Sequence, residues 1–153
     1  MPDCFISYST QDQEFATFVS QELRRQGVST FMASASLQPG QRWSSEIITN
    51  LRDSSWVVVL ASRAACSSAY VNQEIGGALL LSKALVPIVW DMSPTELPGW
   101  LREVQAIDLR GSPLPALRQQ IAAIAHRINQ QNSKGNLILA AAIVGLILLY
   151  TQE

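Results

Sequence analysis

The sequence has few of the residues that most catalytic and metal sites require. It contains one histidine, His126, and two cysteines, Cys4 and Cys66, which lie far apart and form no CxxC pair. A single histidine excludes the usual His-rich metal sites, so we expect no bound metal. Two separate cysteines fit free thiols in a reducing cytosol. His126 falls in a polar stretch, where we expect a solvated surface side chain.

Strong charge of either sign is also lacking. Lysine and arginine together number 11, aspartate and glutamate number 12, and the formal net charge is −1. No basic block is present, so we expect no nucleic-acid partner, because phosphate backbones are bound by clustered positive charge. The N-terminal stretch PDCFISYSTQD is too polar for an export signal.

Familiar nucleotide and hydrolase motifs are missing as well. The sequence contains no GxxxxGK[ST], no GxGxxG after the first apolar run, no GxSxG and no HExxH. Residues 8–12, which follow that first run, carry no acidic pair suited to magnesium. A Ser–His–Asp triad would have to use His126.

What the sequence does contain is an alternation of apolar runs and amphipathic stretches. Gly27 is placed to close the first amphipathic stretch, and Pro39-Gly40 marks a turn in the loop 33–42. The alternation predicts one domain, residues 1–132, with right-handed crossovers. The fold class is α/β: a flavodoxin-like doubly wound five-stranded parallel sheet, which binds ligands beyond the carboxyl ends of its strands. Strands are predicted at 3–7, 28–32, 56–61, 85–90 and 106–109, and the inward-facing helix residues are Phe15, Phe18, Val19, Leu23, Ile47, Ile48, Leu51, Leu117, Ile121, Ile124 and Ile128.

One acidic residue interrupts the apolar face of the helix that follows the third strand. Glu74 shares its side of that helix with Val71, Ile75, Ala78 and Leu79. A carboxylate beside an apolar arc is costly unless it has a partner or a function. Two interpretations stay open: a glutamate at the rim of the arc that reaches solvent or a backbone N–H, or a functional carboxylate. The helix is capped by Ser67 or Ser68.

The C-terminal run 137–150, LILAAAIVGLILLY, is apolar without interruption, after a polar run 129–134 that we expect to end the domain's last helix. As a helix it would be about 21 Å long, against about 30 Å of bilayer hydrocarbon. We predict that 133–153 form a C-terminal apolar helix that anchors the protein in a membrane. The alternative is a helix that buries itself against copies of itself. Arg127 and Lys134 precede the run, which favours a cytoplasmic domain, and Ala141 and Gly145 form a small-xxx-small pair.

Four segments, in this order, resemble a Toll/interleukin-receptor (TIR) domain of bacterial type. They are FISYS at 5–9, LxPGxxW at 37–43, WVVVLAS at 56–62 and YVNQEI at 70–75. The resemblance covers roughly residues 1–130 and implies the five-stranded parallel sheet predicted above.

The resemblance also implies site residues. Many bacterial and plant members cleave NAD+ at the nicotinamide–ribose bond with one glutamate, and Glu74 matches that residue. Ser7 and Tyr8 match the loop that lines the nucleotide. Trp43 matches a position beside the nucleotide, with a core tryptophan at a helix start as the alternative. Tyr70 stands where the family often has tryptophan.

These assignments predict an NAD+ glycohydrolase or ADP-ribosyl cyclase with NAD+ as substrate and no cofactor. One carboxylate suffices for this chemistry, because nicotinamide leaves as a neutral molecule and only the ribose cation needs stabilising. We expect a homo-oligomer at the bacterial inner membrane, with the domain on the cytoplasmic side, acting in anti-phage defence. The alternative function is a non-catalytic scaffold that self-associates through the loop carrying Leu37, Pro39 and Gly40, and a flavodoxin-like electron carrier is a distant third.

Overall fold

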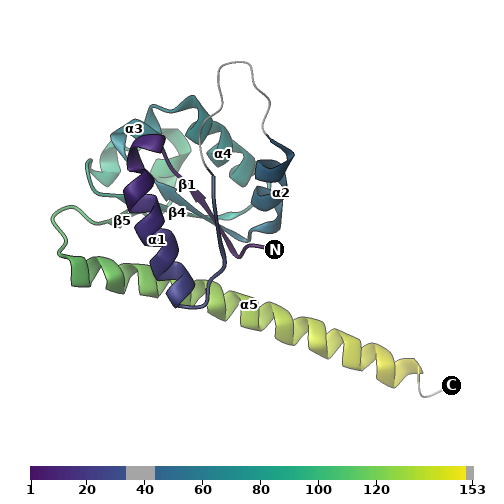
Figure 1. Ribbon diagram of the computed structural model, residues 1–153. Coiled ribbons are helices and arrows are strands. Elements are labelled where there is room, and N and C mark those ends of the chain that lie inside the picture. The colour runs from purple at the N-terminus through teal and green to yellow at the C-terminus, as the bar shows by residue number, and fades with distance from the viewer. Residues whose placement is uncertain (34–43, 151–153) are drawn as a thin grey trace.

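A five-stranded parallel sheet lies at the centre of the molecule, with strand order β2-β1-β3-β4-β5 (Figure 1). The computed structural model describes residues 1–33 and 44–150, without the side chains of Trp100 and of 136–150. The strand order is the flavodoxin-like one that the sequence predicted. The strands are β1 (Cys4–Ser7), β2 (Thr30–Met32), β3 (Trp56–Leu60), β4 (Ala84–Val89) and β5 (Ile107–Asp108).

Helices cover both faces of the sheet (Figure 1). On one face, α1 (Gln13–Arg25) and α5 (Leu114–Tyr150) pack over a core that includes Cys4 and Ile6. On the other face, α2 (Ser45–Asp53), α3 (Arg63–Cys66) and α4 (Ala69–Leu80) pack over a core that includes Phe5. Successive residues of β1 point to opposite faces, so Ser7 points to the same face as Phe5.

Serine caps set the starts of three helices. Ser68, not Ser67, caps α4 by accepting a hydrogen bond from the Val71 N–H at 3.3 Å. Ser44 caps α2 in the same way, and Ser62 caps the short helix α3. Gly27 closes α1 with a φ of 83°, a left-handed conformation that glycine adopts without strain.

Two apolar residues predicted to face the core are partly exposed. Leu79 on α4 is 38% exposed and Ile48 on α2 is 39% exposed. Each follows a buried residue, Ala78 and Ile47, by one position, and one helical position rotates a side chain by about 100°. The predictions for Leu79 and Ile48 were therefore wrong, because the buried face of each helix is narrower than the apolar face that the sequence pattern predicts.

The last helix does not end at the polar run. α5 continues from Leu114 to Tyr150 and extends beyond the domain (Figure 1). Asn129 donates to the Gln26 carbonyl at 2.9 Å and Asn132 donates to Asp3 Oδ1 at 2.8 Å, so the polar side chains bind the domain instead of ending the helix. In the part of the chain that the structure describes, no helix is both long and apolar enough to cross a membrane.

Candidate functional site

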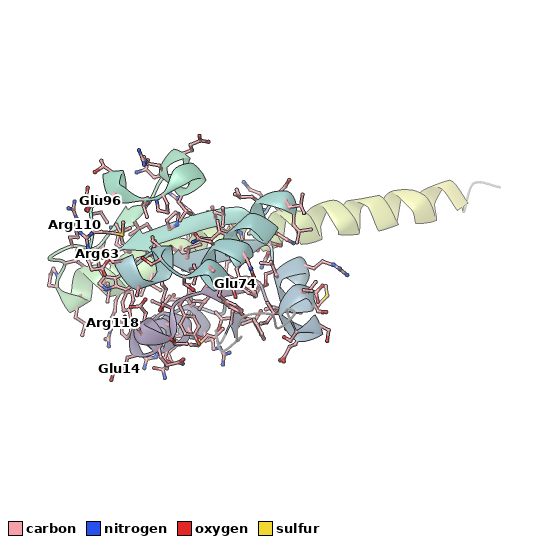
Figure 2. All side chains as sticks on the ribbon, turned by 90° about the horizontal axis from the view of Figure 1, so that it is seen from above. Glu14, Arg63, Glu74, Glu96, Arg110 and Arg118 are labelled. Carbon is pink, nitrogen blue, oxygen red and sulfur yellow. The ribbon has the colours of Figure 1, made fainter. Side chains whose placement is uncertain are left out.

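Glu74 is a residue of α4, and its side chain reaches the carboxyl end of β1. Its side chain is 0% exposed, so the interpretation of a glutamate at the rim that reaches solvent was wrong. Ser7, the last residue of β1, donates a hydrogen bond to Glu74 Oε2. Figure 2 places Glu74 in the middle of the molecule, whereas the other labelled charged residues lie at its periphery. The structure therefore brings together two residues that the sequence assigned separately to the site.

Burial dominates the electrostatics of this carboxyl. It raises the pKa of Glu74 from its ordinary value of 4.5 to about 8, because a buried group disfavours its charged form, and the hydrogen bond from Ser7 and the proximity of the Tyr70 hydroxyl oppose the rise. Burial and the neighbouring negative charge raise the pKa of Tyr70 to about 12. A glutamate with such a shift at the ligand-binding edge of an α/β sheet is a candidate functional residue.

One oxygen of the carboxyl has no hydrogen-bond partner of good geometry in the part of the chain that the structure describes. Tyr70 lies one turn before Glu74 on α4, close enough to affect its pKa. Among the described residues, however, neither the Tyr70 hydroxyl nor Glu74 Oε1 has a hydrogen-bond partner of good geometry. Buried polar atoms are normally paired, so these two atoms mark a place where a ligand group would gain hydrogen bonds.

Tyr8 approaches the site from the opposite face of the sheet. Its ring packs in the core beneath α1 and α5, and its hydroxyl donates to Gln13 Oε1 at 3.1 Å. Burial raises the pKa of Tyr8, the Gln13 bond lowers it, and the negative charge of Glu74 raises it. Its hydroxyl is thus within electrostatic reach of Glu74.

The remaining predicted site residues are not described by the structure. Trp43 and the loop residues Leu37, Pro39 and Gly40 all lie in 34–43, outside the described residues.

Two further residues tie the loops around the site, and neither was predicted to belong to it. Ser62, directly after the apolar run of β3 and Ala61, donates to Asp12 Oδ2 at 2.5 Å. This bond joins the loop after β1 to the loop after β3. Burial raises the pKa of Asp12, Ser62 lowers it and the charge of Asp91 raises it. In the sequence, Ser62 directly follows the most clearly predicted strand, and that position could have indicated that it belongs to the rim of the site.

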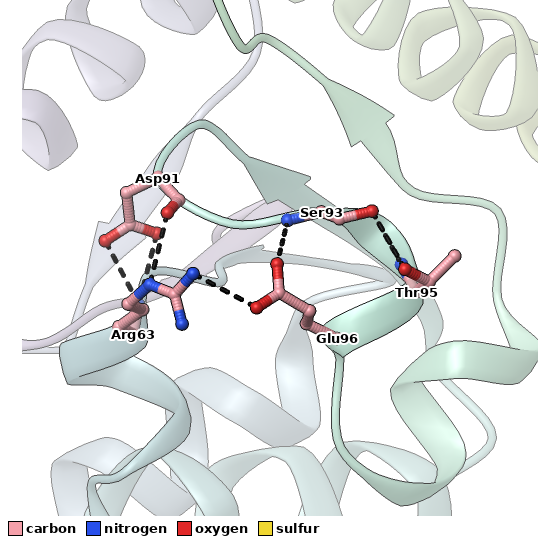
Figure 3. Close-up of polar contacts among 5 residues, drawn as sticks. All are labelled: Arg63, Asp91, Ser93, Thr95 and Glu96. Carbon is pink, nitrogen blue, oxygen red and sulfur yellow. Dashed lines mark hydrogen bonds and ion pairs between the residues drawn. The ribbon is translucent and has the colours of Figure 1, made fainter.

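A second set of contacts joins α3 to the loop after β4 (Figure 3). The Arg63 N–H donates to both Asp91 carboxylate oxygens at 3.2 Å, and the Arg63 guanidinium pairs with Glu96 at 3.1 Å. The Ser93 N–H donates to Glu96 Oε2 at 2.6 Å, and this bond, followed by that from Arg63, lowers the pKa of Glu96. The loops after β1, β3 and β4 therefore form one connected rim beside α4.

The other residues with reactive side chains lie apart from this site. His126 is exposed and its Nε2 lies 3.0 Å from Gln130 Nε2, which confirms the predicted surface position. Cys4 and Cys66 are free thiols, also as predicted. Within residues 1–33 and 44–150, no three His, Cys, Asp or Glu side chains come together as a metal site.

Comparison with known families decides the assignment of the domain. A sequence profile described as "TIR domain" matches residues 4–126, most of the chain. The chain belongs to the TIR domain family. Solved TIR structures have the same fold: the TIR domains of the activated Roq1 resistosome have a TM-score of 0.68 at 21% identity, covering 79% of this chain and 97% of theirs. The TIR domain of the Toll-related receptor TRR-2 from Hydra magnipapillata has a TM-score of 0.61 at 21% identity, with 79% and 98% covered.

One curated relative carries an activity in its name. The protein named "Probable 2' cyclic ADP-D-ribose synthase BdTIR", from Brachypodium distachyon, is 27% identical over 97 residues, or 62% of this TIR chain. The match spans 43% of that relative, less than half of its length. These relatives are from plants and animals where an organism is given, so the bacterial type stays a prediction.

Proposed function

We propose that this TIR domain cleaves NAD+ at the nicotinamide–ribose bond with Glu74 as its catalytic carboxylate, as a hydrolase or a cyclase. The observation that carries the proposal is a buried carboxyl at the ligand-binding edge of the sheet, held at Oε2 by Ser7 and unpartnered at Oε1 among the described residues. The name of the Brachypodium distachyon relative, "Probable 2' cyclic ADP-D-ribose synthase BdTIR", supports NAD+ as the substrate class.

The reaction needs one negative charge at the ribose. The bond between ribose C1′ and the nicotinamide nitrogen breaks, its electron pair stays on the nitrogen, and nicotinamide leaves neutral. An ionised Glu74 stabilises the oxocarbenium-like ribose and accepts hydrogen bonds from its hydroxyls. Water then adds to C1′ and loses its proton to solvent, which gives ADP-ribose, or a hydroxyl of the same molecule adds and loses its proton in the same way, which gives a cyclic product. Neither route uses a metal or cofactor.

The surrounding residues take supporting roles in this proposal. Ser7 orients the carboxylate, while Tyr70 and Tyr8 contact the substrate at the same edge. Trp43 lies beside the nucleotide, as the family resemblance implies. The bonds between Asp12 and Ser62 and between Arg63 and Asp91 hold the rim rigid.

We further propose that the active form is an assembly of TIR domains and that the loop with Leu37, Pro39 and Gly40 makes the contacts between copies. The Roq1 TIR domains belong to an activated resistosome, which supports assembly in the family.

The remaining proposals rest on the sequence: residues 137–150 anchor the protein in the bacterial inner membrane, the domain faces the cytoplasm, and the activity serves anti-phage defence.

The test is nicotinamide release from NAD+ by the full chain. Wild type should release nicotinamide, and Glu74→Gln should lose at least about a hundredfold in rate, the size expected for removing one strong transition-state stabiliser. Glu14→Gln is the matched control, because Glu14 is an exposed glutamate in the first turn of α1. Undiminished activity in a folded Glu74→Gln protein rules out the assignment. No release from wild type in any assembled state leaves the non-catalytic scaffold as the better description.

A further inference from the structure

The amino ends of β1, β3 and β4 meet at one edge of the sheet. These strands begin in register, because Cys4 pairs with Trp56 and Trp56 pairs with Ala84. The segments that lead into β3 and β4, residues 52–55 and 80–83, therefore lie next to each other. We call these two segments the amino edge.

The C-terminal helix leaves the domain beside the amino edge. Gly135 of α5 lines one shallow pocket with Asp3, Asp53 and Ser55. Figure 1 shows the helix continuing past the side of the domain on which the N-terminus lies. The apolar run 137–150 begins two residues after Gly135, a rise of about 3 Å along a helix. When this run lies in a bilayer, the amino edge is held at the depth of the lipid headgroups.

The side chains of the amino edge suit contact with lipid. Leu80 is 85% exposed and Leu81 is 43% exposed, although both are large apolar residues. Lys83 Nζ donates to the Arg52 carbonyl, so the cations of the two segments are neighbours. Exposed leucines beside lysine and arginine are typical of surfaces that bind at the interface of a bilayer.

The charge of this region favours an anionic surface. Arg52 and Lys134 are exposed, and Lys83 keeps donor hydrogens free after its bond to the carbonyl, because an ammonium group has several. Of the acidic residues nearby, Asp3 is held by hydrogen bonds within the domain and Asp53 is half-buried. Each cation at an anionic leaflet strengthens binding by about fivefold.

We propose that the amino edge binds the surface of a bilayer that contains anionic phospholipid, an inference that rests on the proposed membrane anchor. Arg52, Lys83 and Lys134 contact the lipid phosphates. Leu80 and Leu81 enter the boundary between headgroups and acyl chains. The tail and the amino edge then hold the domain together, where the tail alone would be a flexible tether.

This contact fixes the orientation of the domain on the membrane. The carboxyl ends of parallel strands lie at the edge opposite their amino ends, so the edge where Ser7 holds Glu74 points away from the lipid. NAD+ in solution reaches that edge directly. Neighbouring copies also stand with the same side toward the membrane, which favours their assembly in the plane of the bilayer.

The test measures how close each edge of the full chain comes to lipid. A fluorophore is attached to Ser82→Cys at the amino edge or to Thr95→Cys at the opposite edge, since both residues are exposed. Cys66→Ser is the background, and Cys4 is buried. Vesicles consist of phosphatidylcholine alone or with about 30% phosphatidylglycerol, and carry a nitroxide quencher on the headgroups. With phosphatidylglycerol we expect at least about fivefold stronger quenching at position 82 than at position 95.

Removing the cations of the amino edge should remove this contact. Arg52→Gln combined with Lys83→Gln should lower the quenching at Ser82 by at least about fivefold in vesicles with phosphatidylglycerol. Arg110→Gln combined with Arg118→Gln is the matched control. It removes the same charge from the opposite edge, where Arg110 follows β5 and Arg118 lies near the start of α5, and should leave the quenching unchanged.

Extraction with carbonate separates failure of this contact from failure of the anchor. A chain that resists carbonate, yet shows equal quenching at Ser82 and Thr95 or equal effects of the two double variants, retains the anchor and overturns the proposal. A chain that carbonate releases, but that is quenched at Ser82 only with phosphatidylglycerol, loses the anchor and supports the contact. An oligomer that dissociates on Leu80→Ser with unchanged quenching would make the amino edge a contact between copies and also overturn the proposal.

Discussion

Ser7 and Glu74, 67 positions apart in the chain, share a buried hydrogen bond between the end of β1 and the middle of α4. The bond holds one carboxylate oxygen in place, and the other has no partner among the described residues. It also opposes the effect of burial, because a hydrogen bond to the charged form lowers the pKa of Glu74. Position and ionisation of the proposed catalytic group therefore both depend on Ser7.

Replacing Ser7 should consequently change the pH dependence as well as the rate. Without its hydroxyl, the pKa of Glu74 rises further, and less of the protein is ionised at pH 7. We expect Ser7→Ala to lower kcat/KM at pH 7 about tenfold and to move the midpoint of the pH profile up by about one unit. Ser7→Thr keeps the hydroxyl and should restore the profile. A change in KM with an unmoved midpoint would show that Ser7 acts on the substrate instead.

The wild-type pH profile should follow the ionisation of Glu74. A carboxylate that stabilises a cation must be deprotonated, and the pKa of Glu74 in the free protein is about 8. We expect kcat/KM for nicotinamide release to rise from pH 6 to pH 9 with a midpoint near that value, since kcat/KM reports groups of the free enzyme. The kcat profile should have a lower midpoint, because the positive nicotinamide ring of bound NAD+ favours the carboxylate. A flat kcat/KM profile over this range would contradict the role of Glu74.

Stability should depend on pH through the same residue. The pKa of Glu74 rises from 4.5 to about 8 on folding, so between these values the folded state holds a proton that the unfolded state has lost. The stabilising effect of that proton is complete below pH 4.5 and declines as the pH rises toward 8. Glu74→Gln removes this dependence, and its free energy of unfolding should exceed that of wild type by roughly 2–4 kcal/mol at pH 8. Urea unfolding at pH 5 and pH 8 gives the free energy of unfolding of wild type, of Glu74→Gln and of the control Glu14→Gln. An equal change of this free energy with pH in wild type and in Glu74→Gln would refute the prediction.

Activity should rise with assembly. If neighbouring TIR domains complete the site, nicotinamide release per molecule increases with protein concentration and with fusion to an oligomeriser. Light scattering on the same samples gives the oligomeric state at which each specific activity is measured. Constant specific activity of a monomer across the concentration range would exclude the proposed assembly requirement.

Truncation should separate the domain from the tail. A chain that ends at Lys134 keeps the buried residues of α5 and both asparagine contacts, so we expect an unchanged melting temperature. A chain that ends at Gln120 loses Ile121, Ile124 and Ile128, each at most 4% exposed, and should not fold. The full chain should sediment with membranes and resist carbonate, whereas the Lys134 chain stays in the supernatant. Full release by carbonate would disprove the anchor and leave the catalytic proposal standing.

The sequence predicted the elements of the fold well where local physics decides them. The run WVVVL forms β3, Gly27 closes α1, and the alternation of strands and helices predicts the observed strand order. The end of α5 was misjudged, because a run of Asn and Gln only weakly disfavours a helix and these side chains have partners in the domain. Leu79 and Ile48 were misassigned because the width of a buried helix face depends on what packs against it.

By itself, the sequence determined that Glu74 sits on an apolar helix face after the third strand, because helical spacing is a local property. It also determined the fold class, since apolar periodicity specifies strands and helices. Only the tertiary structure decided that Glu74 is fully buried, that Ser7 is its partner, and that Lys83 lies beside Arg52 at the amino edge. Those relationships depend on how the helices lie across the sheet, and no local pattern encodes the distance between residues that far apart in the chain.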